Sequence, residues 1–339
     1  MIWVHDYHLA LVPRFVRDEI DLVVPIGGYW HVPVPTPEEF SHCPNARAIL
    51  DGLFAVDSLG VQTIRDRDNL LRCAETVLDG AVVEYESALV EYEGTTTAIA
   101  VNPVGIDPDE VDRQIDHHTS QNRANTLLER HGVDAGATIL LGVDRLDYTK
   151  GILERLDAFE RLLEQYPDLH GEVILFQKSS PTRGRVPAYK RYRAQVEERI
   201  RRIRTRFETD SWSPIVHVTE SLERATLYGL YRRADVCVVS SRRDGMNLVA
   251  KEFVAASRGD DGVLVCSEFA GAAEKLGTDA ITIDPFDVDS FAESLYRAVT
   301  LDHPERRRRL DRLNDVVREH TVDAWIERSF ESVHPATQR

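Results

Sequence analysis

The chain has 339 residues, of which 42% are hydrophobic and 29% charged, and its formal net charge at pH 7 is −16. A chain of this length can bury a sizeable core and is expected to form two domains. The acidic excess disfavours nucleic acid and anionic membranes as partners, and no apolar run approaches the ~18 to 20 residues of a membrane span.

The amino-terminal segment lacks the pattern of a signal peptide, and the four cysteines are scattered without the spacing of metal ligands. These features favour a cytoplasmic protein with reduced thiols and without a metal. Only five of the 41 basic residues are lysine. An acidic surface poor in lysine suggests adaptation to high salt. The alternative is an ordinary acidic protein from a genome that favours arginine, and equal stability without added salt would support that alternative.

The first predicted strand covers residues 1–4 and ends at a group of polar and aromatic residues that includes Asp6 and Tyr7. An amphipathic helix is predicted for residues 9–19, because apolar residues recur there at helical spacing. A second strand within 25–35 is stopped by prolines just after His31. On its own, Asp6 would be interpreted as a helix cap and His31 as a core residue.

Further strands are predicted in the remaining part of the first domain. Residues 55–63, which include Gln62, form a third strand and a turn, and residues 81–92 and 96–101 alternate between apolar and polar. Turn-forming residues at 102–108 close this domain. The first domain is therefore predicted to span residues 1–108, and the polar, helical stretch 109–136 is predicted to be a linker.

A second series of alternating strands and helices begins with a strand at 137–143 and a helix at 152–166. Arg145 and Lys150 lie between the strand end and the helix start. Two cations and the positive end of a helix can together neutralise a diphosphate. The alternative is that both are surface cations that pair with Asp144 and Asp147.

The next elements are a strand at 171–177, a basic loop at 181–186 that contains Arg183, and a charged helix at 188–205. A strand at 215–218 and a helix at 222–234 follow. Arg183 could simply belong to a basic turn before a basic helix.

A buried strand at 234–239 then leads into the segment 240–256, which ends in a good helix-forming sequence. We expect the amide groups of residues 245–248 to face a ligand at the amino end of this helix, with Asp244 as its N-cap. Glu252 would lie about 12 Å further along the axis. The simpler alternative is a capping aspartate and a solvated glutamate.

The last part of the predicted second domain, 137–302, repeats the strand-and-helix pattern at 262–273 and adds a strand at 281–285. Asp287 and Asp289 have the letters of a metal-binding pair, but their position before a helix favours an N-cap, and no metal is predicted. The helices in 303–339 are expected to cross back to the first domain.

The segment from Arg243 to Phe253 resembles, nearly letter for letter, the donor-binding segment of trehalose-6-phosphate synthases, which are retaining glycosyltransferases of family 20. The segments 5–9, 143–151 and 262–273 are also similar to motifs of this family. The resemblance implies an α/β protein of the GT-B type, with two Rossmann-like domains facing a cleft. It also implies transfer of glucose from UDP-glucose, or another nucleoside-diphosphate glucose, to glucose 6-phosphate, without a cofactor.

The resemblance also implies roles for particular residues. Arg145 and Lys150 would clamp the diphosphate, Glu252 would hold the ribose, and Asp244 and His31 would hold the glucosyl unit. The implied donor-binding residues are Arg145, Lys150, Asp244, Gly245, Met246, Asn247, Leu248 and Glu252. The implied acceptor-binding residues are Asp6, Tyr7, Gln62 and Arg183, and the implied catalytic residues are Asp6, His31, Arg145, Lys150 and Asp244.

Members of this family precede the His-Asp-Tyr-His motif with a strand and a glycine-rich loop, whereas this sequence begins at Met1, immediately before that motif. The first domain is therefore expected to be incomplete and to expose a strand edge that invites self-association or a completing partner. Three hypotheses follow: a shortened form of a normal synthase, a non-catalytic nucleotide-sugar-binding subunit, or a synthase with another phosphorylated acceptor such as glycerol 3-phosphate.

Overall fold

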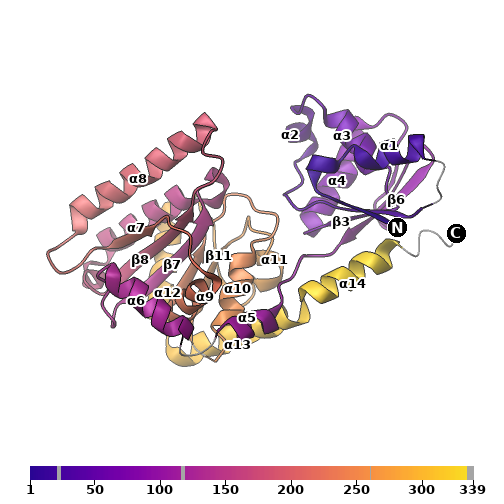
Figure 1. The fold of residues 1–339 in the computed structure, drawn as a ribbon. Coiled ribbons are helices and arrows are strands. Elements are labelled where there is room, and N and C mark those ends of the chain that lie inside the picture. The colour runs from indigo at the N-terminus through magenta and orange to yellow at the C-terminus, as the bar shows by residue number, and fades with distance from the viewer. Residues whose placement is uncertain (21–23, 116–118, 260, 334–339) are drawn as a thin grey trace. The chain divides into compact units, whose positions relative to one another are not determined.

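The computed structural model describes residues 1–20, 24–115, 119–259 and 261–333, and these form two compact units (Figure 1). Unit 1 joins Met1–Gly105 to the segment that begins at His320, and unit 2 comprises Ile106–Glu319. The chain thus leaves unit 1 three residues before the predicted boundary and returns to it at the carboxyl-terminal helix.

Unit 1 is built on a mixed sheet in the order β1-β2-β3-β6-β5-β4. Its strands are β1 (Ile2–His5), β2 (Ile26–Tyr29), β3 (Ser58–Val61), β4 (Val82–Glu84), β5 (Leu89–Tyr92) and β6 (Thr95–Val101). The first four in spatial order are parallel, and β5 and β4 form an antiparallel extension. The strands predicted from the sequence are confirmed, and β2 is shorter than the predicted stretch because residues beyond Tyr29 turn away from the sheet.

Helices and short 3₁₀ turns connect these strands. They are η1 (Tyr7–Leu9), α1 (Val12–Glu19), α2 (Pro37–Ser41), α3 (Ala46–Leu53), α4 (Ile64–Val77) and α14 (Val322–Val333). The helices α1 to α4 contact one another, whereas α14 contacts β2 and β3. The helix predicted for 9–19 begins at Val12, because residues 7–9 form the tighter turn η1 and Pro13 lies in the first turn of α1.

Unit 1 has an edge strand, β1, and exposed apolar residues in and before α1. β1 lies at one end of the sheet order. Leu11, just before α1, is 43% exposed, and Phe15, in α1, is 62% exposed. Such an edge can template pairing with another chain. The self-association expected from the sequence stays a prediction.

Unit 2 is built on a parallel sheet in the order β12-β11-β10-β7-β8-β9. Its strands are β7 (Thr138–Arg145), β8 (Val173–Ser180), β9 (Ile215–Val218), β10 (Val236–Val239), β11 (Val263–Ser267) and β12 (Ile281–Ile283). β10 is buried along its whole length, as expected of an apolar strand covered on both faces. Every strand predicted for this unit is present.

Helices cover both faces of the second sheet. They are α5 (Pro108–Gln114), α6 (Thr119–Arg130), η2 (Tyr148–Lys150), α7 (Ile152–Gln165), η3 (Pro167–Leu169), α8 (Pro187–Phe207), α9 (Arg224–Arg233), α10 (Leu248–Ala256), α11 (Ala273–Leu276), α12 (Val288–Thr300) and α13 (His303–Glu319). α7 contacts α8 and α12, and α9 contacts α6 and α10, which gives two helical layers. None of the helices in the described residues is long and apolar enough to cross a membrane.

The predicted linker 109–136 has a different role. Its residues form α5 and α6, and α6 packs against α9 with Ala124, Leu127 and Leu128 buried. The stretch is polar overall, but one face of α6 is apolar, which ties it to unit 2. It is therefore part of the second unit and not a separate linker.

Strand order identifies the place in unit 2 where a ligand is expected. The order β9-β8-β7-β10-β11-β12 is that of a dinucleotide-binding Rossmann sheet, in which successive strands are added on one side of β7 up to β9 and on the other side from β10 onward. Ligands of such sheets bind beyond the carboxyl ends of the strands at this switch point. The segments after β7 and β10 are those that the sequence singles out.

Candidate active site

Two loops of unit 2 meet at the switch point. The loop after β10 donates the Arg242 backbone N–H to the Thr149 carbonyl at 2.8 Å, and the Ser240 hydroxyl donates to the Gly151 carbonyl at 2.8 Å. Gly151 has φ of +64°, and a Cβ on it would lie 1.8 Å from the Ser240 carbonyl oxygen. Only glycine fits there, so the backbone that carries Lys150 is held against the loop that carries Asp244.

Lys150 and Asp244 form an ion pair at the junction of these loops. The Lys150 Nζ lies 2.5 Å from Asp244 Oδ2, and the two side chains are 14% and 16% exposed. The same carboxylate oxygen accepts from the Ser241 hydroxyl at 3.2 Å and from Asn247 Nδ2 at 3.0 Å. A largely buried cation thus sits beside a carboxylate whose position is fixed by several donors.

Arg145 lies at the carboxyl end of β7, with its side chain exposed. The preceding residue, Asp144, accepts from the buried Arg155 at 2.6 Å, and Arg155 also donates to Gln177 at 2.7 Å. Asp147 accepts from the Thr149 backbone N–H at 3.0 Å. Asp144 and Asp147 therefore accept hydrogen bonds from other groups, and the alternative that they pair with Arg145 and Lys150 is wrong.

The start of α10 differs from the prediction. Asn247, with φ of +98°, is the N-cap, and its side chain accepts from the Ala250 backbone N–H at 3.0 Å. Asp244 is not the cap, because residues 244–246 are extended along the loop after β11. The Asp244 N–H donates to the Phe269 carbonyl at 3.1 Å, and the Met246 carbonyl accepts from Ala272 at 2.8 Å. Gly245, Met246 and Asn247 thus lie in the loop after β10, and the helix begins at Leu248.

Glu252 lies one turn into α10. Burial raises the pKa of its carboxyl, and the hydroxyl of Tyr231 donates to its Oε2 at 3.2 Å. It is therefore not the solvated helix glutamate of the simpler interpretation.

Arg183 approaches the same loops from the segment before α8. Its guanidinium donates to the Tyr189 hydroxyl at 3.1 Å, and that hydroxyl donates to Asp147 at 3.2 Å. Arg183 is exposed and has φ of +43°. Tyr189 thereby connects the predicted phosphate-binding arginine to the turn that carries Lys150.

Three of the predicted residues of unit 1 lie at the carboxyl ends of β1 and β2. The Asp6 backbone N–H donates to the Tyr29 carbonyl at 2.7 Å, and Asp6 Oδ1 accepts from the His31 N–H at 3.4 Å. Tyr7 follows in η1 and is 38% exposed. The sheet thus brings Asp6, Tyr7 and His31 together, as their strand-end positions predict.

His31 belongs to a cluster of rings that also contains His5 and Trp325, which were not predicted from the sequence. Its Nε2 lies 2.9 Å from His5 Nδ1, and the ring of Trp325 lies 6.3 Å from each of the two imidazoles. Burial, and secondarily His5, lower the pKa of His31, whereas Asp6 raises it. The shift favours the neutral form of the imidazole.

Gln62 is 2% exposed, and its side-chain carbonyl accepts from the Val104 backbone N–H at 3.0 Å. This hydrogen bond fixes the segment after β6 and is a structural contact. The acceptor role of Gln62 stays a prediction. Asp287 caps α12 by accepting from the Ser290 N–H at 3.1 Å, as predicted, and among the described residues no cluster of His, Cys, Asp and Glu suited to a metal is found.

Backbone strain coincides with the predicted site. Among the described non-glycine residues, positive φ angles occur at Asp6, Arg183 and Asn247, and otherwise in the turns at Ala88 and Glu93. Such conformations cost about 1 to 3 kcal/mol each and concentrate at functional sites. Three of the predicted residues are thus held in conformations that local energy disfavours.

Asp6 offers a direct test, because its φ of 62° and ψ of 173° fall in a region that is essentially restricted to glycine. Asp6→Gly is expected to raise the free energy of unfolding by about 1 kcal/mol, since strain relief exceeds the entropy cost of glycine, and to abolish activity. Asp6→Ala is the matched control, because it removes the carboxylate and keeps the strain. Denaturant unfolding in which both variants lose stability equally would contradict the strain argument.

A pH dependence follows from His31. Because its pKa in the folded protein lies below the ordinary 6.5, the unfolded chain binds more protons as the pH falls below 6.5. The contribution of neutral His31 to stability is therefore present above pH 6.5 and is lost at lower pH. Unfolding titrations should show that wild type loses more stability than His31→Gln between pH 7 and 5, and parallel curves would contradict this.

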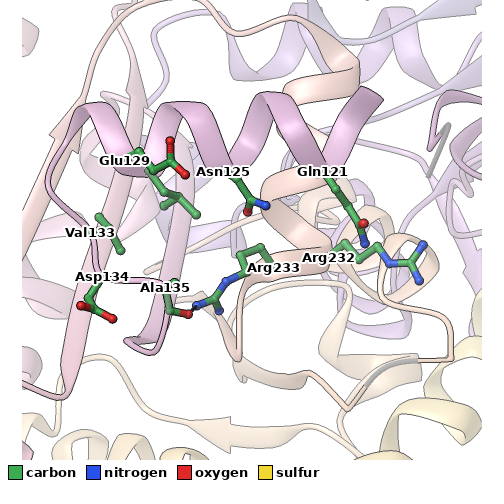
Figure 2. Close-up of a pocket in the computed structure, with 10 residues that line it drawn as sticks. Gln121, Asn125, Glu129, Val133, Asp134, Ala135, Arg232 and Arg233 are labelled. Carbon is green, nitrogen blue, oxygen red and sulfur yellow. Dashed lines mark hydrogen bonds between the residues drawn. The ribbon is translucent and has the colours of Figure 1, made fainter. Parts of the chain in front are cut away.

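A cavity of about 370 Å³ lies elsewhere in unit 2 (Figure 2). It is lined by residues of α6, α9 and 133–135, and the Arg233 guanidinium donates to the Ala135 carbonyl at 2.7 Å. These segments immediately precede β7 and β10. The cavity is therefore at the amino ends of those strands, opposite the edge that carries Arg145 and Asp244.

Two Rossmann-like sheets, with a pair of cations and a carboxylate at the switch point of the second, define a glycosyltransferase of the GT-B type. The model of glycosyltransferase family 20 matches residues 1–335, and the chain belongs to this family. A curated relative is the UDP-forming alpha,alpha-trehalose-phosphate synthase of Pichia angusta, which is 35% identical over 331 residues, 96% of this chain and 68% of that protein.

Solved structures agree with this assignment. A trehalose-6-phosphate structure from E. coli, bound with UDP-2-fluoro glucose, superposes with a TM-score of 0.91 at 35% identity, over 100% of this chain and 73% of that one. An alpha,alpha-trehalose-phosphate synthase from Burkholderia xenovorans, in complex with glucose-6-phosphate, gives a TM-score of 0.90 at 34% identity, over 98% and 73% of the two chains.

Proposed function

We propose that the chain transfers glucose from UDP-glucose to glucose 6-phosphate and releases trehalose 6-phosphate and UDP, with retention at the anomeric carbon. The observation that carries this proposal is the arrangement at the switch point, where Arg145, Lys150 and Asp244 leave neighbouring strand ends. The names of the relatives support the same reaction, as do the UDP-2-fluoro glucose and glucose-6-phosphate in the solved structures.

The donor is proposed to bind along the loops after β7 and β10. A cation next to an acceptor-only carboxylate suits a ligand that has a phosphate beside sugar hydroxyls. Arg145 and Lys150 would stabilise the charge that develops on the diphosphate as it leaves, and Asp244 would accept hydrogen bonds from the glucosyl unit. Glu252 would receive the ribose hydroxyls.

The proposed transfer takes place without a covalent enzyme intermediate. The bond between the anomeric carbon and the diphosphate oxygen breaks, and a bond to the anomeric oxygen of glucose 6-phosphate forms on the same face. The proton of that hydroxyl passes to the departing diphosphate. The protein then contributes positioning and charge stabilisation, with Asp6, Tyr7, His31 and Arg183 assigned to the sugars and the acceptor phosphate.

We further propose a cytoplasmic setting, which the free thiols of Cys43, Cys73, Cys237 and Cys266 support. Salt adaptation and a role of the product in osmoprotection belong to the same proposal. The net charge of −16 and the small number of lysines support salt adaptation.

Product analysis tests the reaction and the acceptor together. The 339-residue chain is incubated in high salt with UDP-glucose and an equimolar mixture of glucose 6-phosphate and glycerol 3-phosphate. We expect a single phosphorylated disaccharide whose NMR spectrum shows two α-linked anomeric centres. A glycerol phosphate glucoside would assign the chain to another acceptor, and an inverted linkage would contradict the retaining mechanism.

A further inference from the structure

Glu252 has a partner that the proposed mechanism does not use. Tyr231 lies on α9, its side chain is fully buried, and its hydroxyl donates to Glu252 Oε2 at 3.2 Å. The Tyr231 carbonyl accepts from the Ser257 hydroxyl at 3.3 Å, which ties the end of α10 to α9. The hydroxyl of Tyr231 therefore has a fixed position relative to α10.

A carboxylate that binds a vicinal diol has two requirements. It must be ionised, because only the ionised form accepts hydrogen bonds at both oxygens, and its plane must be oriented. A hydrogen bond to one oxygen sets the orientation of the other. Tyr231 is placed to satisfy the second requirement through Oε2.

The surroundings of Glu252 make the first requirement demanding. Burial raises the pKa of its carboxyl, whereas the hydrogen bond from Tyr231 and the charge of Arg224, also on α9, lower it. Burial, and to a smaller extent the charge of Glu252, raise the pKa values of Tyr228 and Tyr231 on α9 and of the Cys237 thiol on β10, which favours the neutral forms of these groups. Of these groups, Tyr231 donates a hydrogen bond to the Glu252 carboxylate, and Arg224 is a cation whose charge acts on it.

We propose that Tyr231 is a positioning residue for the donor, whose hydroxyl orients the Glu252 carboxylate so that it receives both hydroxyls of the ribose. This inference rests on the proposed function, in which Glu252 binds that ribose. It predicts a specific defect in ribose binding when the hydroxyl is removed.

The test measures binding of UDP and of dideoxy-UDP, which lacks both ribose hydroxyls, by calorimetry to the whole chain. Tyr231→Phe keeps the buried ring and is expected to weaken UDP binding roughly five- to tenfold, with dideoxy-UDP unchanged. Tyr228→Phe, on the same helix and 5% exposed, is the matched control and should bind both ligands as wild type does.

A pH series and a double variant distinguish positioning from a general structural defect. Loss of the hydroxyl raises the pKa of Glu252. As the pH is lowered, the UDP affinity of Tyr231→Phe should therefore begin to fall at a higher pH than that of wild type. In a Glu252→Gln background, the further change Tyr231→Phe should cost no UDP affinity, because the two residues act as one unit.

Equal weakening of UDP and dideoxy-UDP in Tyr231→Phe would overturn the inference, since that pattern indicates a structural role. Unchanged UDP binding in Tyr231→Phe, with wild type preferring UDP over dideoxy-UDP, would overturn the inference and leave the proposed function intact. Wild type that does not bind UDP would overturn both.

Discussion

Replacing Lys150 by alanine is expected to lower kcat/KM for UDP-glucose by about 100- to 1000-fold, which corresponds to roughly 3 to 4 kcal/mol of transition-state stabilisation. The reason is that Lys150 lies at the switch point with Arg145, and its loss also leaves Asp244 without its ion-pair partner at 2.5 Å. Steady-state measurement of UDP release gives the effect.

The control for this variant is Lys190→Ala. Lys190 is an exposed lysine on α8 in the same unit, and its removal changes the net charge equally. We expect it to leave kcat/KM within about twofold of wild type, since exposed charges are screened by salt. A similar, small loss in both variants would show that Lys150 acts only through the overall charge.

Gly151→Ala is expected to have the largest effect on stability. Its φ of +64° penalises any side chain, and the added Cβ would lie 1.8 Å from the Ser240 carbonyl oxygen. Backbone strain and overpacking together predict a loss of about 2 to 5 kcal/mol in the free energy of unfolding. Because Lys150 is the preceding residue, UDP affinity should fall as well.

Gly171→Ala provides the comparison that isolates the collision. Gly171 also has a positive φ, +87°, but a Cβ at this position would meet no atom within 4 Å beyond its chain neighbours. This variant should lose only the conformational term of about 1 to 2 kcal/mol and should bind UDP normally. Equal stability losses in the two variants, measured by denaturant unfolding, would show that the contact between Gly151 and Ser240 does not constrain the site.

The strands of both units and the grouping of Asp6 with His31 could be predicted from the sequence. Buried parallel strands have continuous apolar runs, and polar residues just after such runs lie at one edge of the sheet. Arg145 and Lys150 follow the same rule, and for that reason the predicted diphosphate site coincides with the switch point between β7 and β10.

Contacts between distant segments could not be predicted in this way. Asp244 was expected to cap α10, but residues 244–246 pair instead with the loop after β11, and Asn247 caps the helix. His5 and Trp325 meet at His31 although they are far apart in the sequence. The segment 109–136 was predicted to be a linker because its composition is polar. The few apolar residues of α6 nevertheless pack against α9 and make it part of unit 2.

The proposed transfer can be measured as UDP release from UDP-glucose by this chain, in high salt, with and without glucose 6-phosphate. We expect release that depends on glucose 6-phosphate and is lost in Lys150→Ala. A folded chain that binds UDP and releases none from UDP-glucose in the presence of glucose 6-phosphate would contradict the proposed transfer.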